Sequence, residues 1–175
     1  MPQYYIYLIS SLPVLEFGAA PPFSWSEFLK ICTGKIPEAD LALLEKASTN
    51  TESHPVAAMS ATFSRWRLFD TALRNELVKI RSARKHIDPE KYLRHNGYAD
   101  PLIAHIAMNA YRMSSVLEAE KMLDQARWQF LEELGLGHYF DLDYLLLYAQ
   151  KLFILERWQK IRSSDGQALL DRALS

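Results

Sequence analysis

Apolar side chains recur along most of this chain with the period of an α-helix. Between residues 56 and 86, apolar positions follow one another at spacings of three and four, which places them on one face of a helix: Trp66, Phe69, Leu73, Leu77 and Ile80. The stretch from 115 to 134 repeats this pattern with Leu123, Ala126, Phe130 and Leu134. The sequence therefore predicts two long helices in these ranges.

Start and stop signals predict three shorter helices and the loops between them. The sequence SWSE at residues 24–27 is a capping box, and the helix that it starts runs through Cys32 and stops at Gly34. A proline in the first turn starts a second helix over residues 37–47, and an Asp-Pro pair starts a third over residues 100–112. Residues 48–55 and 96–97 are expected to form a polar loop and a turn.

The N-terminal segment has a different composition. Residues 4–12 are aromatic and β-branched, which favours a short strand or a buried extended stretch, and the prolines and glycine of residues 13–23 favour an irregular linker. No basic residue precedes the apolar stretch, so a secretory signal is not expected. We predict a single domain over residues 1–175, all-α or nearly so, in which an extended segment (1–23) packs on a helical bundle (24–175).

The last long helix, predicted over residues 142–162, is apolar nearly all round. Asp143, Gln150 and Arg157 fall seven apart and form one narrow polar strip, while most other positions are apolar. Such a helix is central in its bundle or covered by a partner. Its charged residues argue against a membrane span. Ser164 is a candidate cap for a short final helix.

Glu156 falls among the apolar positions of this last helix. A carboxylate there needs a cation or hydrogen-bond donors, since an unpaired buried charge is very unfavourable. Arg74 and Arg81 on the long helix are the candidate partners. A glutamate turned to solvent and a catalytic carboxylate are the alternatives.

The sequence HYFDLD at residues 138–143 contains one histidine and two aspartates within six residues. Asp141 lies where a helix N-cap belongs, and Asp143 falls in the first turn, where acidic side chains are favoured. The alternative, a metal site, needs a further ligand from elsewhere and matches no strong motif. We therefore interpret the aspartates as capping residues and expect no metal and no cofactor.

Composition and charge argue against several classes of function. Apolar residues make up 49% of the chain and the net charge is −1, which indicates a folded protein and argues against nucleic-acid binding. The lone Cys32 cannot form an intramolecular disulfide and suits a cytoplasmic protein. The five histidines are scattered, and neither a phosphate-binding loop nor a nucleophile elbow is present. An enzyme is therefore not predicted.

Three arginines line one edge of the long helix. Arg67, Arg74 and Arg81 are spaced by seven, and Asp70 is placed to pair with Arg74 one turn away. The edge is a candidate docking surface for an acidic protein partner; the alternative is a solvated flank with one internal ion pair.

Several stretches resemble a bacterial family whose genes accompany V/A-type ATPase operons. They are YYIYLISSLPVLEFGAAPPFSWSEFL (residues 4–29), LRNEL (73–77), ARWQFLEEL (126–134) and HYFDLDYLLLYAQKLFILERW (138–158). The opening SLP-x-L and the closing HYFDLD…ILERW are the distinctive parts.

The resemblance implies an accessory or assembly role around a rotary ATPase. A further similarity is to the C subunit, also called d, a helical protein that joins the central stalk to the membrane ring. LRNEL and ILERW are expected to make internal structural contacts. We therefore expect a non-enzymatic accessory, assembly or stalk-type subunit, with V/A-type ATPase stalk or ring subunits as partners, located at the cytosolic face of the membrane. The alternative is a small helical metal-dependent hydrolase.

Overall fold

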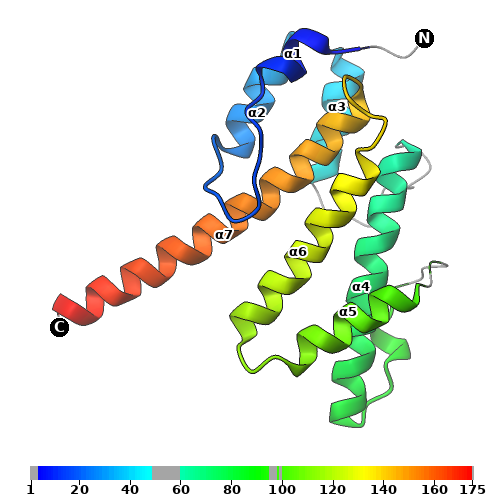
Figure 1. The fold of residues 1–175 in the computed structure, drawn as a ribbon, viewed down its shortest axis with the longest axis vertical. Helices are drawn as coiled ribbons and strands as arrows, with labels where there is room; N and C mark the ends of the chain where they lie inside the picture. The colour runs from blue at the N-terminus through cyan, green and yellow to red at the C-terminus, as the bar shows by residue number, and fades with distance from the viewer. Residues whose placement is uncertain (1–3, 49–59, 95–97, 99, 175) are drawn as a thin grey trace. The chain divides into compact units, whose positions relative to one another are not determined.

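The computed structural model describes residues 4–48, 60–94, 98 and 100–174 and shows an all-α protein (Figure 1). The regular structure of these residues consists of seven α-helices and one short 3-10 helix: α1 (Ile6–Ser11), α2 (Trp25–Cys32), α3 (Glu38–Ser48), α4 (Ala61–Lys85), η2 (Glu90–Tyr92), α5 (Pro101–Arg112), α6 (Val116–Leu134) and α7 (Leu142–Leu174). The all-α fold class predicted from the sequence is therefore confirmed.

The chain divides into two compact units. Unit 1 consists of residues 1–54 together with 135–175, and unit 2 consists of residues 55–134. Unit 1 thus combines two stretches that are far apart in the sequence, whereas unit 2 is one continuous segment. The expectation of a single domain over residues 1–175 stays a prediction.

Unit 1 is built around α7, which packs against α2 and α3 (Figure 1). Side chains on most sides of this helix are at most 5% exposed, as its nearly continuous apolar sequence predicts: Leu145, Leu146, Leu147, Tyr148, Ala149, Leu152 and Leu155. From α2, Phe28 is fully buried and its ring stacks on that of Tyr148, with centroids 5.3 Å apart. α7 is therefore the central helix of its unit.

The start of α2 agrees with its predicted capping box. The Ser24 hydroxyl accepts a hydrogen bond from the Glu27 amide, and the Glu27 carboxylate accepts one from the Ser24 amide. At the other end of the helix, Cys32 is fully buried. Burial raises the pKa of its thiol to about 11, against a small lowering by Lys35. Cys32 is therefore an unreactive thiol of the core.

The predicted strand at residues 4–12 is wrong, because residues 6–11 form the helix α1. Tyr5, Leu8 and Ile9 are buried, which is a helical spacing, whereas Tyr7 is 95% exposed. A strand would have placed Tyr5, Tyr7 and Ile9 on one face. The aromatic and β-branched composition was outweighed by burial of one side of a helical turn.

The last helix is also longer than predicted, since α7 continues through Ser164 to Leu174. The hydroxyls of Ser163 and Ser164 both donate to the carbonyl of Lys160, one turn back in the same helix. Ser164 therefore bonds within α7 rather than capping a new helix.

Unit 2 packs α4, α5 and α6 against one another. The predicted faces are buried at Trp66, Phe69 and Leu73 of α4 and at Leu123 and Leu134 of α6. Between these two helices, the rings of Phe69 and Phe130 stack with centroids 4.0 Å apart. α4 begins after its cap Ser60 and ends at His86, which adopts a left-handed conformation with φ of 53°.

The segment after α4 is held by a side chain of the LRNEL stretch. The Asn75 amide donates to the carbonyl of Arg94 (2.8 Å), and its oxygen accepts from the Arg94 amide (3.0 Å). Asn75 thus satisfies both backbone groups of one loop residue, an internal contact of the kind expected for LRNEL. The predicted turn at 96–97 and the loop at 49–55 lie outside the described residues, whereas α4 begins at Ala61 and not near Val56 as predicted, because Ser60 is extended and caps the helix.

Candidate functional site

The loop between α6 and α7 brings together the histidine and aspartates singled out from the sequence. α6 ends at Leu134, the first residue of a Leu-Gly-Leu-Gly stretch in which Gly137 has φ of 91°, a left-handed conformation that favours glycine. The Asp141 carboxylate then accepts a hydrogen bond from the Tyr144 amide through Oδ1 (3.0 Å). Tyr144 is the third residue of α7, so the predicted N-cap is confirmed.

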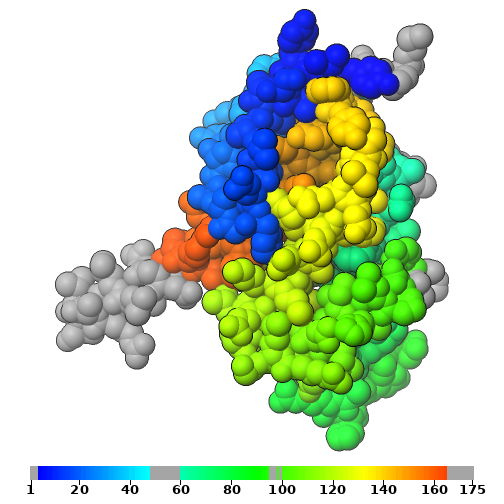
Figure 2. All heavy atoms as spheres, viewed as in Figure 1, coloured from blue at the N-terminus to red at the C-terminus, as the bar shows by residue number. Residues whose placement is uncertain are grey.

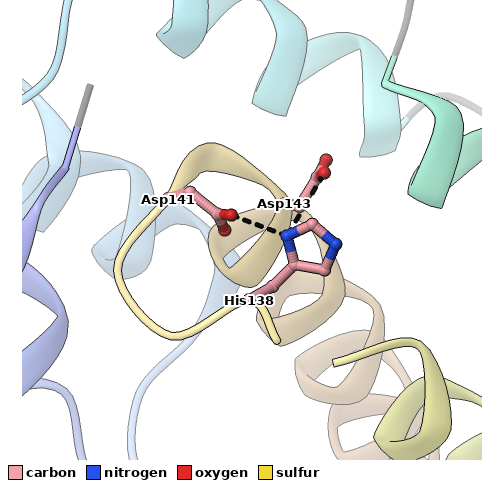
Figure 3. Close-up of side chains that lie close together, drawn as sticks. All are labelled: His138, Asp141 and Asp143. Atoms are coloured by element: carbon pink, nitrogen blue, oxygen red, sulfur yellow. Dashed lines mark hydrogen bonds and ion pairs between the residues drawn. The ribbon is translucent and has the colours of Figure 1, made fainter. Parts of the chain in front are cut away.

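His138 lies between the two carboxylates at this end of α7 (Figure 3). Its Nδ1 is 2.6 Å from Asp141 Oδ2 and 3.6 Å from Asp143 Oδ2. The three side chains retain 29%, 26% and 17% exposure respectively, so the cluster is partly open to solvent. One potential ligand atom from each residue lies within 4.8 Å of the others. We call these residues the His138 cluster.

Within the His138 cluster, Asp143 has an unusual environment. Its Oδ1 is buried, and among the described residues it has no hydrogen-bond partner. Buried carboxylate oxygens in native proteins almost always accept a hydrogen bond or bind an ion, because losing hydration without replacement is unfavourable. Capping accounts for Asp141 but leaves this oxygen of Asp143 unexplained.

Next to the cluster, α1 and the loop before α7 expose a set of apolar side chains. The Tyr5 amide donates to the carbonyl of Phe140 (2.5 Å), which joins the two segments. In the space-filling view, the dark blue atoms of α1 lie at the surface beside the gold atoms that lead into α7 (Figure 2). We define the α1–loop surface by its five exposed side chains: Tyr4 (65%), Ile6 (51%), Tyr7 (95%), Tyr139 (63%) and Phe140 (38%).

Tyr5 points the other way, into unit 1. Its hydroxyl donates to the carboxylate of Asp40 on α3. Burial raises the pKa of Tyr5, and the hydrogen bond and negative charge of Asp40 raise it further. α1 is therefore fixed to α3 on its inner side while its outer side remains exposed.

Glu156 finds a donor of a different kind from the arginines suggested by the sequence. Its Oε1 accepts a hydrogen bond from the backbone amide of Trp25 (2.8 Å), the first residue of α2. The first amides of a helix have no partner within the helix, and the positive end of the helix dipole favours an anion. Glu156 therefore stabilises the start of α2, an internal contact of the kind expected for ILERW.

The arginine edge of α4 contains both paired and exposed side chains. Arg74 binds Asp70 at 2.8 Å, as predicted, and its side chain is 38% exposed. Arg67 is half-buried and Arg81 is exposed. The edge lies on the surface of one helix of unit 2, and its role in docking stays a prediction.

Sequence reasoning missed the ionic network that extends from Asp70. Arg127 of α6 binds Asp70 (2.8 Å) and Asp124 (2.9 Å), and Asp124 is only 1% exposed. Burial alone would lower the pKa of Arg127, but the two carboxylates outweigh it and raise the pKa. The sequence did indicate that Asp124 would be buried and need a partner, because it shares a helical face with Trp128 and Leu131, both of which are buried.

Over the described residues, the helices include none whose length and apolar character would let it cross a bilayer. A family described as "Protein of unknown function (DUF2764)" matches residues 103–174, which is fewer than half of the 175 residues. The matched region runs from α5 through α7 and so includes the His138 cluster and Glu156. No curated protein and no solved structure matches the chain.

Proposed function

We propose that this protein is a non-enzymatic accessory, assembly or stalk-type subunit of a V/A-type ATPase, held at the cytosolic face of the membrane by contacts with stalk or ring subunits. The observation that carries the proposal is the α1–loop surface. Its exposed residues come from YYIYLI and HYFDLD, two of the stretches that resemble the ATPase-associated family.

The structure supports a binding role for these stretches through their shared placement. Tyr5 and Phe140 are joined by a backbone hydrogen bond, and the Tyr148 hydroxyl donates to the carbonyl of Pro13 (2.9 Å) in the SLP-x-L stretch. Rigidly held tyrosines and phenylalanines are typical anchors of protein interfaces, because they bury a large area and lose little entropy on binding. Clustered exposed apolar side chains also mark interaction sites more often than isolated ones do.

The arginine edge of α4 supplies a second candidate contact in the same proposal. Exposed basic side chains mainly accelerate association and select an acidic partner, whereas buried aromatic anchors supply most of the affinity. Substitutions of Arg67, Arg74 and Arg81 are therefore expected to change the salt dependence of partner binding more than its affinity.

Affinity purification from the native host tests the proposal. The tagged chain is recovered first without and then with detergent, and bound proteins are identified by mass spectrometry. ATPase stalk or ring subunits are expected in the bound fraction. Their absence from a cell that expresses the complex would contradict the proposal.

A pair of tyrosine variants locates the contact. Tyr7→Ser removes the most exposed residue of the α1–loop surface and should lower recovery of ATPase subunits about tenfold or more. Tyr92→Ser, at a 54% exposed tyrosine of unit 2, is the matched control and should leave recovery unchanged. Equal recovery with both variants would exclude the α1–loop surface as the contact.

The alternative function, a small metal-dependent hydrolase, has one supporting observation, the convergence of His138, Asp141 and Asp143. Its test is the hydrolysis of chromogenic phosphate and carboxylic esters with Zn²⁺ or Mn²⁺ added. Turnover that His138→Ala abolishes would favour the hydrolase over the interaction protein.

A further inference from the structure

The His138 cluster contains more ligating atoms than the helix cap uses. Asp141 caps α7 through Oδ1 alone. Its other oxygen, Oδ2, and Asp143 Oδ2 both face His138 Nδ1. Asp143 Oδ1 is buried and has no hydrogen-bond partner in the described part of the chain. An ion held by Asp143 Oδ2 would offset the negative charge that this carboxylate shares with its buried, unbonded Oδ1.

The spacing of the three ligand atoms suits a cation. Imidazole nitrogens and carboxylate oxygens lie about 2.0–2.2 Å from a bound transition metal, so ligands at tetrahedral or octahedral angles are about 3–3.5 Å apart. The 3.6 Å separation of His138 Nδ1 from Asp143 Oδ2 is close to this value. The 2.6 Å separation from Asp141 Oδ2 must widen by about half an ångström, which a small side-chain rotation allows.

Charge also favours a cation at this position, although the site lies at a helix N-terminus. The helix dipole contributes roughly half a positive charge there, which opposes cation binding. Two carboxylates contribute two full negative charges at closer range, and a divalent ion neutralises them when the imidazole is neutral. The partial exposure of all three side chains leaves the remaining coordination positions open to water.

We propose that His138, Asp141 and Asp143 bind one divalent transition-metal ion. A set of one imidazole and two carboxylates suits Zn²⁺ or Mn²⁺, whereas Mg²⁺ and Ca²⁺ prefer ligands that are all oxygen. The ion joins the loop after α6 to the first turn of α7 and pairs the charge of Asp143. This inference does not depend on the ATPase proposal.

The first experiment is a calorimetric titration of the full, metal-free chain with ZnCl₂, MnCl₂ and MgCl₂. One saturable site for Zn²⁺ or Mn²⁺ and weaker binding of Mg²⁺ are expected. With Mn²⁺, paramagnetic broadening in the ¹⁵N spectrum should centre on the amides of residues 138–144. If neither Zn²⁺ nor Mn²⁺ binds saturably, or if broadening centres elsewhere, the proposal is overturned.

Variants then assign the ligands. His138→Gln and Asp143→Asn should each weaken binding about tenfold or more, since each removes one ligand without touching the cap residue Asp141. His105→Gln, at an exposed histidine that bonds Asn109 in α5, is the matched control and should bind like the wild type. Circular dichroism checks that each variant folds. Unchanged affinity in a folded His138→Gln variant would place the ion elsewhere and refute the site.

Discussion

Within each of the two units, a different kind of polar contact joins the helices and loops. In unit 1, side chains of α7 bind backbone groups of distant segments: Glu156 binds the Trp25 amide, Tyr148 the Pro13 carbonyl and Gln150 the Ala47 carbonyl, and Arg162 the carbonyls of Gly18 and Ala19. In unit 2, the polar link between α4 and α6 is made by charged side chains on both sides: Arg74, Asp70, Arg127 and Asp124.

This difference follows from the parts that the polar contacts position in each unit: an irregular stretch of backbone in unit 1 and two packed helices in unit 2. The N-terminal half of unit 1 contains an irregular stretch between α1 and α2, whose backbone groups cannot be satisfied by regular helix bonds. Side chains of α7 satisfy some of them. The three α-helices of unit 2 are each longer than α1, α2 and α3, and the charged link between α4 and α6 fixes the register of one helix against another. Loss of a contact should therefore affect the units differently.

High pH should produce the largest difference between the units. Burial raises the pKa of Cys32 to about 11 and also raises the pKa values of Tyr5, Tyr144 and Tyr148, all of which belong to unit 1. The unfolded chain releases these protons near pH 9 for the thiol and pH 10 for the phenols, whereas the folded chain keeps them. Stability is therefore intact below pH 9 and falls as the pH rises, by about 1.4 kcal/mol per pH unit for each group between its two pKa values.

Tryptophan fluorescence can assign this alkaline loss to a unit, since each unit contains two tryptophans. Trp25→Phe with Trp158→Phe leaves the probes of unit 2, and Trp66→Phe with Trp128→Phe leaves those of unit 1. Urea unfolding at pH 8 and pH 11 should show the greater loss with the unit 1 probes. An equal loss with both sets would contradict the assignment to unit 1.

Breaking the ionic network of unit 2 should have the next largest effect. Arg127→Ala removes the guanidinium that binds Asp124, a carboxylate at 1% exposure, and should lower the free energy of unfolding by about 3–5 kcal/mol. Arg81→Ala, at an exposed arginine of α4, is the control and should change the free energy of unfolding by less than about 0.5 kcal/mol. Urea unfolding at pH 7 measures both. A loss below about 1 kcal/mol for Arg127→Ala would mean that the network adds little to stability.

Removing a side chain-to-backbone contact of unit 1 should have a smaller effect. Glu156→Ala removes the acceptor of the Trp25 amide and the anion at the start of α2, which is expected to lower stability by about 1–2 kcal/mol. Glu156→Gln keeps an acceptor oxygen and removes only the charge, so its loss should be at most about 1 kcal/mol. Thermal unfolding by circular dichroism distinguishes them. Equal losses for both variants would show that the charge, and not the hydrogen bond, stabilises α2.

The sequence predicted those features that depend on neighbouring residues. The capping box at Ser24, the helix over residues 101–112 and the N-cap role of Asp141 all rest on groups within a few positions, and the structure confirms them. α1 was missed because six residues provide little periodicity and its composition favours strands. Its helical form depends on burial against residues far along the chain.

Partners distant in the sequence could not be predicted in the same way. The donor to Glu156 is 131 positions away, and Arg127 is 57 positions from Asp70. The sequence indicated that Glu156 needed a donor but not which one. For the His138 cluster, spacing alone predicted the cap, whereas the orphaned oxygen of Asp143 became visible only in three dimensions.

The discontinuity of unit 1 has a consequence for how the protein is made. Unit 2 is complete once residue 134 has left the ribosome, whereas the start of α2 lacks its Glu156 acceptor until more than a hundred further residues have been synthesised. At about 5–20 residues per second, the N-terminal segment remains without α7 for on the order of ten seconds. During that time its tyrosines, phenylalanines and Cys32 are available to chaperones. The nascent chain should therefore recruit them most strongly through its first fifty residues.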